Sequence, residues 1–382
     1  MLHWKRYLVI PVACIVAGFL ATADAQGPKK ESSETVARPR KKGSSGSPAE
    51  EAELPKIPSR TMKKEGEQKL PEGLATFRSD ATTVSVDVAV IDNKGRFIPK
   101  IPGGNFRVLE DNVPQKINGF SMGEAPMTVA MVIEFSNLYQ QYWSEPWYQT
   151  LMATYGFVET LKPEDYVAII AYDLRPEILS DFTTDRRQTQ EALQRLRIAA
   201  YSESNLFDAL VDTAERMSEI EGRKAIVLIS SGVDTFSKLT FDKTRKALQN
   251  AGVPIYALGL MQALREYLDA RGALGPIARL DFLQADNNLR TFSKETGGMA
   301  FLPRFYGEFP GIFRAIHEAL RNQYVLTYNP TNQARDGKFR KLKVELVNPA
   351  TNEPLKVTDE KGKPIKYQVI AKAGYTAPRE VE

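Results

Sequence analysis

The chain has 382 residues, of which 42% are hydrophobic, so it is long enough to form two compact domains. Its formal net charge of +4 is small for this length, and the composition therefore gives little support for a nucleic-acid partner. With one cysteine, two histidines and no glycine-rich phosphate loop, the sequence also argues against zinc sites, histidine-based catalytic triads and phosphate-loop nucleotide binding.

Residues 1–25 have the pattern of a signal peptide for export. The basic pair Lys5-Arg6 precedes the apolar stretch Leu8–Leu20, and the small-residue site Ala23-Asp24-Ala25 follows. The alternative is an uncleaved membrane anchor, but the apolar stretch is shorter than the roughly 20 residues needed to span a bilayer. We expect cleavage before Gln26 and a periplasmic, cell-surface or secreted location, with no transmembrane segment in the mature form.

Residues 26–76 are expected to form a disordered linker. The part up to Leu70 is rich in Lys, Glu, Ser and Pro and contains no aromatic residue. Such a composition cannot bury enough apolar surface to offset the entropy lost on ordering. Its basic clusters are interpreted as solvated, with attraction to anionic lipid or cell-wall polymer as the alternative.

Two β-rich segments, residues 77–122 and 323–378, flank the middle of the chain. In the first segment, every second residue from Val84 to Val90 is valine, and Asp111-Asn112 supplies a turn. Neither segment is large enough to form a core alone. We therefore predict that the two segments pair into one small antiparallel β-sandwich and that the domain between them is inserted into it.

Residues 126–322 alternate between apolar strands and amphipathic helices, which predicts an α/β domain with a doubly wound, mostly parallel six-stranded sheet. The predicted parallel strands are Thr128–Glu134, Tyr166–Tyr172, Ala225–Ile229, Pro254–Leu260 and Gly298–Leu302. A sixth strand, Glu177–Phe182, follows its predecessor too closely for a crossover helix and should be antiparallel. The predicted helices are Pro146–Leu161, Arg186–Arg197, Asn205–Ile220, Phe241–Asn250, Asn288–Glu295 and Phe309–Arg321.

Polar residues lie next to the carboxyl ends of these strands, where open α/β sheets bind their ligands. The residues of this candidate site are Glu134, Ser136, Asp173, Ser204, Ser231 and Asp234. Oxygen atoms dominate the set, and hard cations such as Mg²⁺ prefer oxygen ligands.

At these points the chain resembles the von Willebrand factor A (VWFA) family, whose metal-ion-dependent adhesion site combines an Asp-x-Ser-x-Ser loop with a Thr and an Asp from two further loops. The flanks resemble VWFA-related proteins of the acidobacterial type, in the stretches Phe106–Asp111, Gln323–Tyr328, Asp336–Lys341 and Gly374-Tyr375. The resemblance covers about residues 77–378. It implies a binding module with a metal site at Glu134, Ser136, Ser204 and Ser231.

The metal site that the resemblance implies is degenerate. Glu134 stands at the position of the first Asp, and Leu138 stands at that of the second Ser. Ser204 and Ser231 replace the Thr and the third-loop Asp. Because Mg²⁺ needs a near-octahedral set of oxygen ligands, the loss of one hydroxyl and one carboxylate should weaken its binding. We expect weak or no metal dependence, with the other acids of the site as alternative ligands.

Aromatic residues crowd the segment after the first strand. The predicted binding residues are Tyr139, Tyr142, Trp143, Asp173 and Asp234. Exposed Trp and Tyr rings would anchor a partner, whereas Trp147 and Tyr148 are expected to pack as core. Farther along, Met261–Asp286 is longer than an ordinary connection, and it is interpreted as a structural crossover, with a lid over the site as the alternative.

Together these patterns predict an exported protein-binding, adhesion or scaffolding module rather than an enzyme. Its expected partner is a protein or a glycan of the cell envelope. One alternative is a hydrolase of cell-surface polymers that uses Glu134 and Asp173 as a carboxylate pair. The other alternative is a structural component of a secreted assembly.

Overall fold

The computed structural model of the protein describes residues 83–379 except 94, 123–125, 137–143, 197–201, 274 and 359–361. The chain divides into two units, residues 1–57 and 58–382, and all described residues belong to the second. The predicted signal peptide and linker lie outside the described residues and stay predictions. Within the described ranges, no helix has both the length and the apolar content needed to cross a membrane.

A β-sandwich is formed jointly by the two flanking segments, as predicted. Two four-stranded antiparallel sheets make it, in the orders β15-β1-β11-β4 and β16-β12-β2-β3. The strands are β1 (Val84–Asp92), β2 (Phe106–Glu110), β3 (Val113–Gln115), β4 (Ile117–Met122), β11 (Tyr324–Tyr328), β12 (Phe339–Leu346), β15 (Tyr367–Ala371) and β16 (Gly374–Thr376). A short 3₁₀ helix, Gly103–Asn105, precedes β2, and the hairpin β13 (Val357–Thr358) and β14 (Pro364–Ile365) lies between β12 and β15.

The alternation of valines with other residues along β1 explains how this strand contributes to the core of the sandwich. The four valines Val84, Val86, Val88 and Val90 are buried against the apolar faces of β2, β11 and β12. Between β2 and β3, Asp111 and Asn112 have φ angles of 47° and 68°, values that a tight hairpin requires and that Asn and Asp tolerate. The predicted turn is thus confirmed.

The α/β domain contains a six-stranded sheet in the order β10-β9-β8-β5-β6-β7. Its strands are β5 (Met127–Glu134), β6 (Tyr166–Tyr172), β7 (Pro176–Thr183), β8 (Arg223–Ser230), β9 (Ile255–Gly259) and β10 (Ala300–Phe301). All neighbours run parallel except β7, which pairs antiparallel with β6 as predicted. The predicted fold class, a mostly parallel α/β sheet inserted into an antiparallel sandwich, is confirmed.

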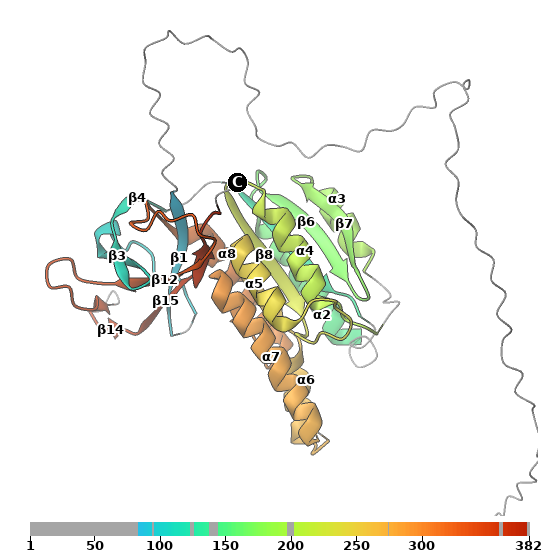
Figure 1. The fold of residues 1–382 in the computed structure, drawn as a ribbon. Helices are drawn as coiled ribbons and strands as arrows, with labels where there is room; N and C mark the ends of the chain where they lie inside the picture. Colours follow the sequence, from blue (N-terminus) through green and yellow to red (C-terminus); the bar gives the residue numbers. More distant parts are fainter. Residues whose placement is uncertain are drawn as a thin grey trace, which may run out of the picture. The chain divides into compact units, whose positions relative to one another are not determined.

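Helices cover both faces of this sheet. On β5, Val129, Met131 and Ile133 belong to a core that also includes side chains of α2 (Ser144–Thr160) and α8 (Phe309–Asn322). The alternate residues of the strand pack against α4 (Leu206–Ser218) in a second core. The helix α3 (Arg186–Gln194) also contributes to the first core, and α5 (Phe241–Ala251) and α7 (Pro276–Thr296) contribute to the second (Figure 1). A 3₁₀ helix, Tyr306–Glu308, precedes α8.

The prediction for one helix of the α/β domain is wrong in its bounds. The helix predicted at Asn288–Glu295 is the last part of α7, which begins at Pro276, and the preceding residues form α6 (Met261–Ala270). Met261 and Phe282 form a small separate core between these two helices, and Arg265 pairs with Asp286 at 3.1 Å. The long connection is therefore a helical hairpin (Figure 1).

The inserted domain leaves and rejoins the sandwich at neighbouring strands. β4 ends at Met122 and β11 begins at Tyr324, and these two residues are partners in one antiparallel ladder. The insertion therefore does not interrupt the sheet to which it is attached.

Candidate functional site

The centre of the candidate site is Glu134, the last residue of β5. The sheet register places it opposite Tyr172 at the end of β6, and its neighbour Ile133 opposite Ile229 of β8. Glu134 and Tyr172 are each 1% exposed, and Ser230 at the end of β8 is fully buried. The carboxylate of Glu134 therefore lies at the carboxyl edge of the sheet but beneath its surface.

Protein donors surround both carboxylate oxygens of Glu134. Oε2 accepts hydrogen bonds from the Ser231 backbone N–H at 2.8 Å and from the Ser230 hydroxyl at 3.0 Å, and the Tyr172 hydroxyl lies 3.2 Å away. Oε1 accepts from the Ser136 hydroxyl at 3.3 Å. Tyr172 also donates to Ser230 at 2.7 Å. Glu134 thus ties three adjacent strand ends together.

Burial dominates the electrostatics of Glu134. Desolvation raises the pKa of its carboxyl above 4.5, although the hydrogen bonds from Ser231, Ser230 and Tyr172 act in the opposite direction. A carboxyl group with a raised pKa gives up its proton less readily. A cation at this position would therefore have to displace that proton.

The two other hydroxyls predicted as ligands also have protein partners. The Ser204 hydroxyl donates to the Val233 carbonyl at 2.8 Å, and the Ser231 hydroxyl accepts from the Val233 N–H at 2.9 Å. Both serines are fully buried. Between Ser231 and Val233, Gly232 has a φ angle of +83°, a conformation that favours glycine and allows the chain to turn after β8.

This donor set does not fit a divalent cation. It holds one carboxylate, whose oxygens already accept hydrogen bonds, and hydroxyls that are already hydrogen-bonded to that carboxylate or to backbone groups. In the part of the chain that the structure describes, no three His, Cys, Asp or Glu side chains are grouped so that they could hold a metal ion. The polar edge formed by Glu134, Ser136, Ser204, Ser230 and Ser231, here called the sealed rim, is a closed hydrogen-bonded network.

The predicted binding residues Asp234 and Asp173 lie beside the sealed rim in different roles. Asp234 accepts from the Phe207 N–H at 3.1 Å and from the Ser237 hydroxyl at 2.5 Å, so it caps the start of α4. Its burial raises the pKa of the carboxyl. Asp173 is half-buried, and its carbonyl accepts from the Asn205 N–H at 2.8 Å. Asp234 therefore organises the loop around α4.

The aromatic residues divide into two groups. Tyr139, Tyr142 and Trp143 lie outside the described residues, as does Leu138, so their exposure stays a prediction. Trp147 is half-buried against Phe135, at a ring separation of 5.5 Å, and this prediction is confirmed. Tyr148 is 56% exposed, so the prediction that it packs as core is wrong. It is the next residue along α2 after Trp147.

The sequence patterns also missed an exposed apolar stripe on α7. Ile277, Leu280 and Leu283 are 77%, 65% and 55% exposed, respectively. They lie three residues apart and therefore along one side of the helix. Their spacing was a signal for a helix that begins before Asn288. From the sequence, this segment is instead interpreted as a structural crossover.

The fold and the sealed rim define a class of protein, namely an open, doubly wound α/β domain with polar loops at the carboxyl edge of its sheet. Residues 140–233 match the sequence profile of the von Willebrand factor type A domain. This part of the α/β domain is therefore similar to the von Willebrand factor type A family. A comparison with curated proteins gives no match.

Solved structures with a similar arrangement share little sequence with this chain. A von Willebrand factor type A protein from Catenulispora acidiphila is 11% identical, with 78% of this chain and 76% of that one covered and a TM-score of 0.40. The corresponding domain of the type V pili tip protein Mfa5 from Porphyromonas gingivalis is 15% identical, with 51% and 96% covered and a TM-score of 0.38.

Proximal thread matrix protein 1 from the mussel byssus is 8% identical, with 53% of this chain covered and a TM-score of 0.40. This chain spans half the length of the mussel protein, at 50%. The likeness to the von Willebrand factor type A family is therefore carried by the profile match over residues 140–233. The acidobacterial type of the flanks stays a prediction.

Proposed function

We propose that the protein is an exported recognition module that binds a protein partner at the carboxyl edge of its α/β domain without a resident metal ion. The observation that carries the proposal is the environment of Glu134. Because its carboxylate accepts hydrogen bonds from Ser136, Ser230 and Ser231, the position that the family uses for metal chemistry is occupied by structural contacts. Recognition would then depend on shape and on aromatic side chains.

Exposed aromatic rings are suited to this task. Tyr148 is 56% exposed on α2, and Tyr139, Tyr142 and Trp143 precede it by a few residues in the sequence. Trp and Tyr contribute large contact areas at a low cost in side-chain entropy, and they are enriched among the residues that dominate binding energies. A surface built from them needs no cation to bind a protein.

The proposal includes that the protein is not an enzyme. A hydrolase with Glu134 and Asp173 as its carboxylate pair would need both groups in contact with one glycosidic bond. The 1% exposure of Glu134 weighs against such contact. We expect the wild type and Glu134→Gln to release no more reducing ends from envelope polysaccharide than a blank without protein does. Release by the wild type alone would contradict this part of the proposal.

A capture experiment tests the binding function. Immobilised wild-type protein, Trp143→Ala and Tyr148→Ala are incubated with solubilised envelope proteins of the source organism, in EDTA or in Mg²⁺. Tyr166→Ala is the matched control, because Tyr166 is also an exposed tyrosine, at 41%, but begins β6 at the opposite end of the sheet. Quantitative mass spectrometry then compares the captured proteins.

We expect a defined set of proteins that is retained by Tyr166→Ala, lost with Trp143→Ala and Tyr148→Ala, and unchanged by EDTA. Loss of that set in EDTA would overturn the metal-independent mechanism. Full retention by both aromatic variants would overturn the binding surface. Export is tested separately by intact mass, since cleavage leaves Gln26 as the first residue.

A further inference from the structure

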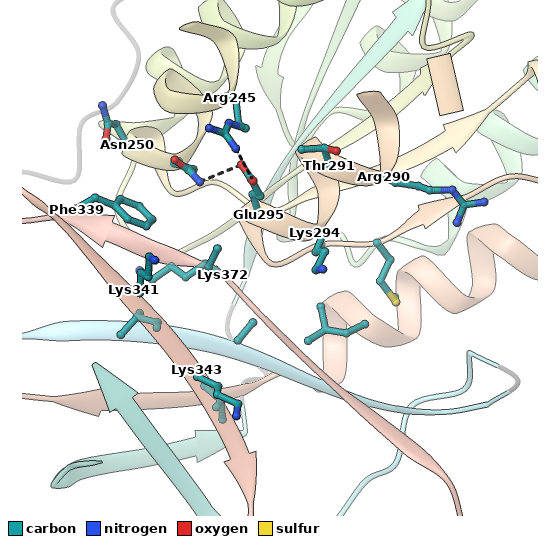
Figure 2. A pocket seen from close by; sticks show the side chains of 18 of the residues that line it. Arg245, Asn250, Arg290, Thr291, Lys294, Glu295, Phe339, Lys341, Lys343 and Lys372 are labelled. Atoms are coloured by element: carbon teal, nitrogen blue, oxygen red, sulfur yellow. Dashed lines mark hydrogen bonds and ion pairs between the residues drawn. The ribbon is translucent and has the colours of Figure 1, made fainter. Parts of the chain in front are cut away.

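A broad cationic cleft lies away from the sealed rim, where α5, α7 and β10 meet β12, β15 and β16 (Figure 2). Its volume is about 1840 Å³. Two backbone contacts join its walls, because the Ala373 N–H donates to the Glu295 carbonyl at 3.0 Å and Gly297 packs against the backbone of Lys372. None of the sealed-rim residues lines it.

The charge of the cleft is strongly one-sided. Eight of its lining side chains are Lys or Arg, and one, Glu295, is acidic. Glu295 is already engaged, since its carboxylate accepts from Arg245 at 3.4 Å and from Gln249 at 2.9 Å (Figure 2). The net positive charge therefore remains available to a ligand.

Within the described ranges, five of these cations form no side-chain ion pair with an acid. Among the residues that the structure describes, no side-chain hydrogen bond or ion pair joins Lys246, Arg290, Lys294, Lys341 or Arg379 to an acid. All five side chains are exposed, and they come from both walls of the cleft. Like charges that face one another across a concave surface attract a ligand of the opposite sign.

Two sheet edges border the same cleft. Among the described strands, β15 pairs only with β1, and β10 pairs only with β9. Val369 and Ile370 of β15 and Phe301 of β10 line the cleft. An edge strand presents backbone N–H and C=O groups that a further strand can pair with, and bound peptides use this mode of recognition.

Apolar side chains lie between the cations. Phe301 comes from the α/β domain, Phe339 and Ile370 come from the sandwich, and all three are half-buried. An extended peptide presents its side chains alternately to two sides, so one side can carry carboxylates to the lysines while the other packs on these apolar groups. A polyphosphate chain or a nucleic acid has neither apolar side chains nor a backbone that pairs with a strand edge.

We propose that this cleft binds an extended acidic segment of a partner protein, which adds as a strand at the edge of β15. Acidic side chains of the segment pair with Lys294, Arg290 and Lys341, and its alternate apolar side chains pack between the two walls. The surface is separate from the sealed rim, so the inference does not depend on the function proposed there.

The test uses a fluorescein-labelled decapeptide of alternating Glu and Val, with anisotropy measured on the full chain. A second peptide carries N-methyl groups on alternate backbone nitrogens, which removes donors for strand pairing and leaves the charge unchanged. A peptide of alternating Lys and Val, inorganic polyphosphate and a DNA duplex complete the probes.

Two charge-reversal variants locate the site. Arg290→Glu/Lys294→Glu changes one wall of the cleft. Lys243→Glu is the matched control, because Lys243 is exposed on α5 beside the cleft but does not line it. We expect the acidic peptide to bind the double variant at least about tenfold more weakly than it binds the wild type, and to bind Lys243→Glu as tightly as the wild type. The N-methylated peptide and the Lys-Val peptide should not bind the wild type. Thermal melting confirms that both variants fold.

Any of five results would overturn the proposal. Equal binding of the N-methylated peptide or of polyphosphate would mean that the cleft is a general anion site without strand addition. Tighter binding of DNA would assign it to nucleic acid. Absence of binding by the Glu-Val peptide, or equal weakening by Lys243→Glu, would mean that the lysines only protect the sheet edges from aggregation.

Discussion

Substitution of Glu134 separates two roles of its carboxylate, hydrogen-bond acceptor and negative charge. In Glu134→Gln the amide oxygen can take the place of Oε2 and keep the hydrogen bonds from Ser231 and Ser230, so the cost should be about 1 kcal/mol or less. In Glu134→Ala the buried Ser231 N–H loses its acceptor, at about 1–3 kcal/mol, and a buried methylene is lost, at about 0.8 kcal/mol. The total is about 2–4 kcal/mol.

Urea unfolding at neutral pH, followed by tryptophan fluorescence and circular dichroism in EDTA, measures both changes. Glu177→Gln, on an exposed glutamate of β7, is the control and should leave the free energy of unfolding unchanged. If Glu134→Gln is as destabilising as Glu134→Ala, then the negative charge itself is required, as it would be in a cation site. That result would refute the account of the sealed rim.

The wild type and Glu134→Gln can also be compared as a function of pH. Burial raises the pKa of Glu134 above 4.5, so the folded state binds its proton more tightly than the unfolded state does. The resulting stabilisation is complete below about pH 4.5 and is lost as the pH rises through the folded-state pKa. Glu134→Gln has no such proton, so its stability relative to the wild type should improve with rising pH.

Three further outcomes are expected. The variant Glu134→Asp/Leu138→Ser/Ser204→Thr/Ser231→Asp restores the family's ligand at each position where this chain departs from it. Mg²⁺ should raise its melting temperature, by the equivalent of about 1.4 kcal/mol at a concentration of ten times Kd, and should leave that of the wild type unchanged. A folded variant whose melting temperature does not respond to Mg²⁺ would contradict this. Asp165→Ala should lower the free energy of unfolding in urea by about 3–5 kcal/mol, because it leaves the guanidinium of Arg321 without its fully buried partner; a loss under about 1 kcal/mol would speak against this. Burial lowers the pKa of His317, so the melting temperature should fall as the pH drops below about 6.5, and less so in His317→Gln; equal pH profiles would rule His317 out.

The α/β domain was predictable because its central strands are buried on both faces. The apolar runs at β5 and β8 have almost no polar residue, and β6 begins and ends at the residues predicted for it. The α6–α7 hairpin was not predictable in the same way, because the exposed Ile277, Leu280 and Leu283 do not face a core. A periodic apolar pattern indicates a helix most clearly when the apolar side is buried.

The candidate site was predictable in position but not in chemistry. The sequence indicates that Glu134 and Ser231 meet at one sheet edge, since both follow parallel strands. It does not indicate that the Ser231 backbone N–H and the Tyr172 hydroxyl point at the carboxylate, because those contacts depend on strand register and on burial. The family motif therefore implies ligands where the structure places hydrogen-bond partners.

The pairing of β1 sets an order of folding. Its partners are β11 and β15, so Val84 meets Tyr328, and the whole α/β domain lies between them in the chain. During synthesis the contiguous α/β domain is complete before β11 exists, whereas β1 must wait for its neighbours. A polypeptide truncated before β11 would therefore carry a finished α/β domain together with an unpaired, valine-rich strand that is prone to aggregate.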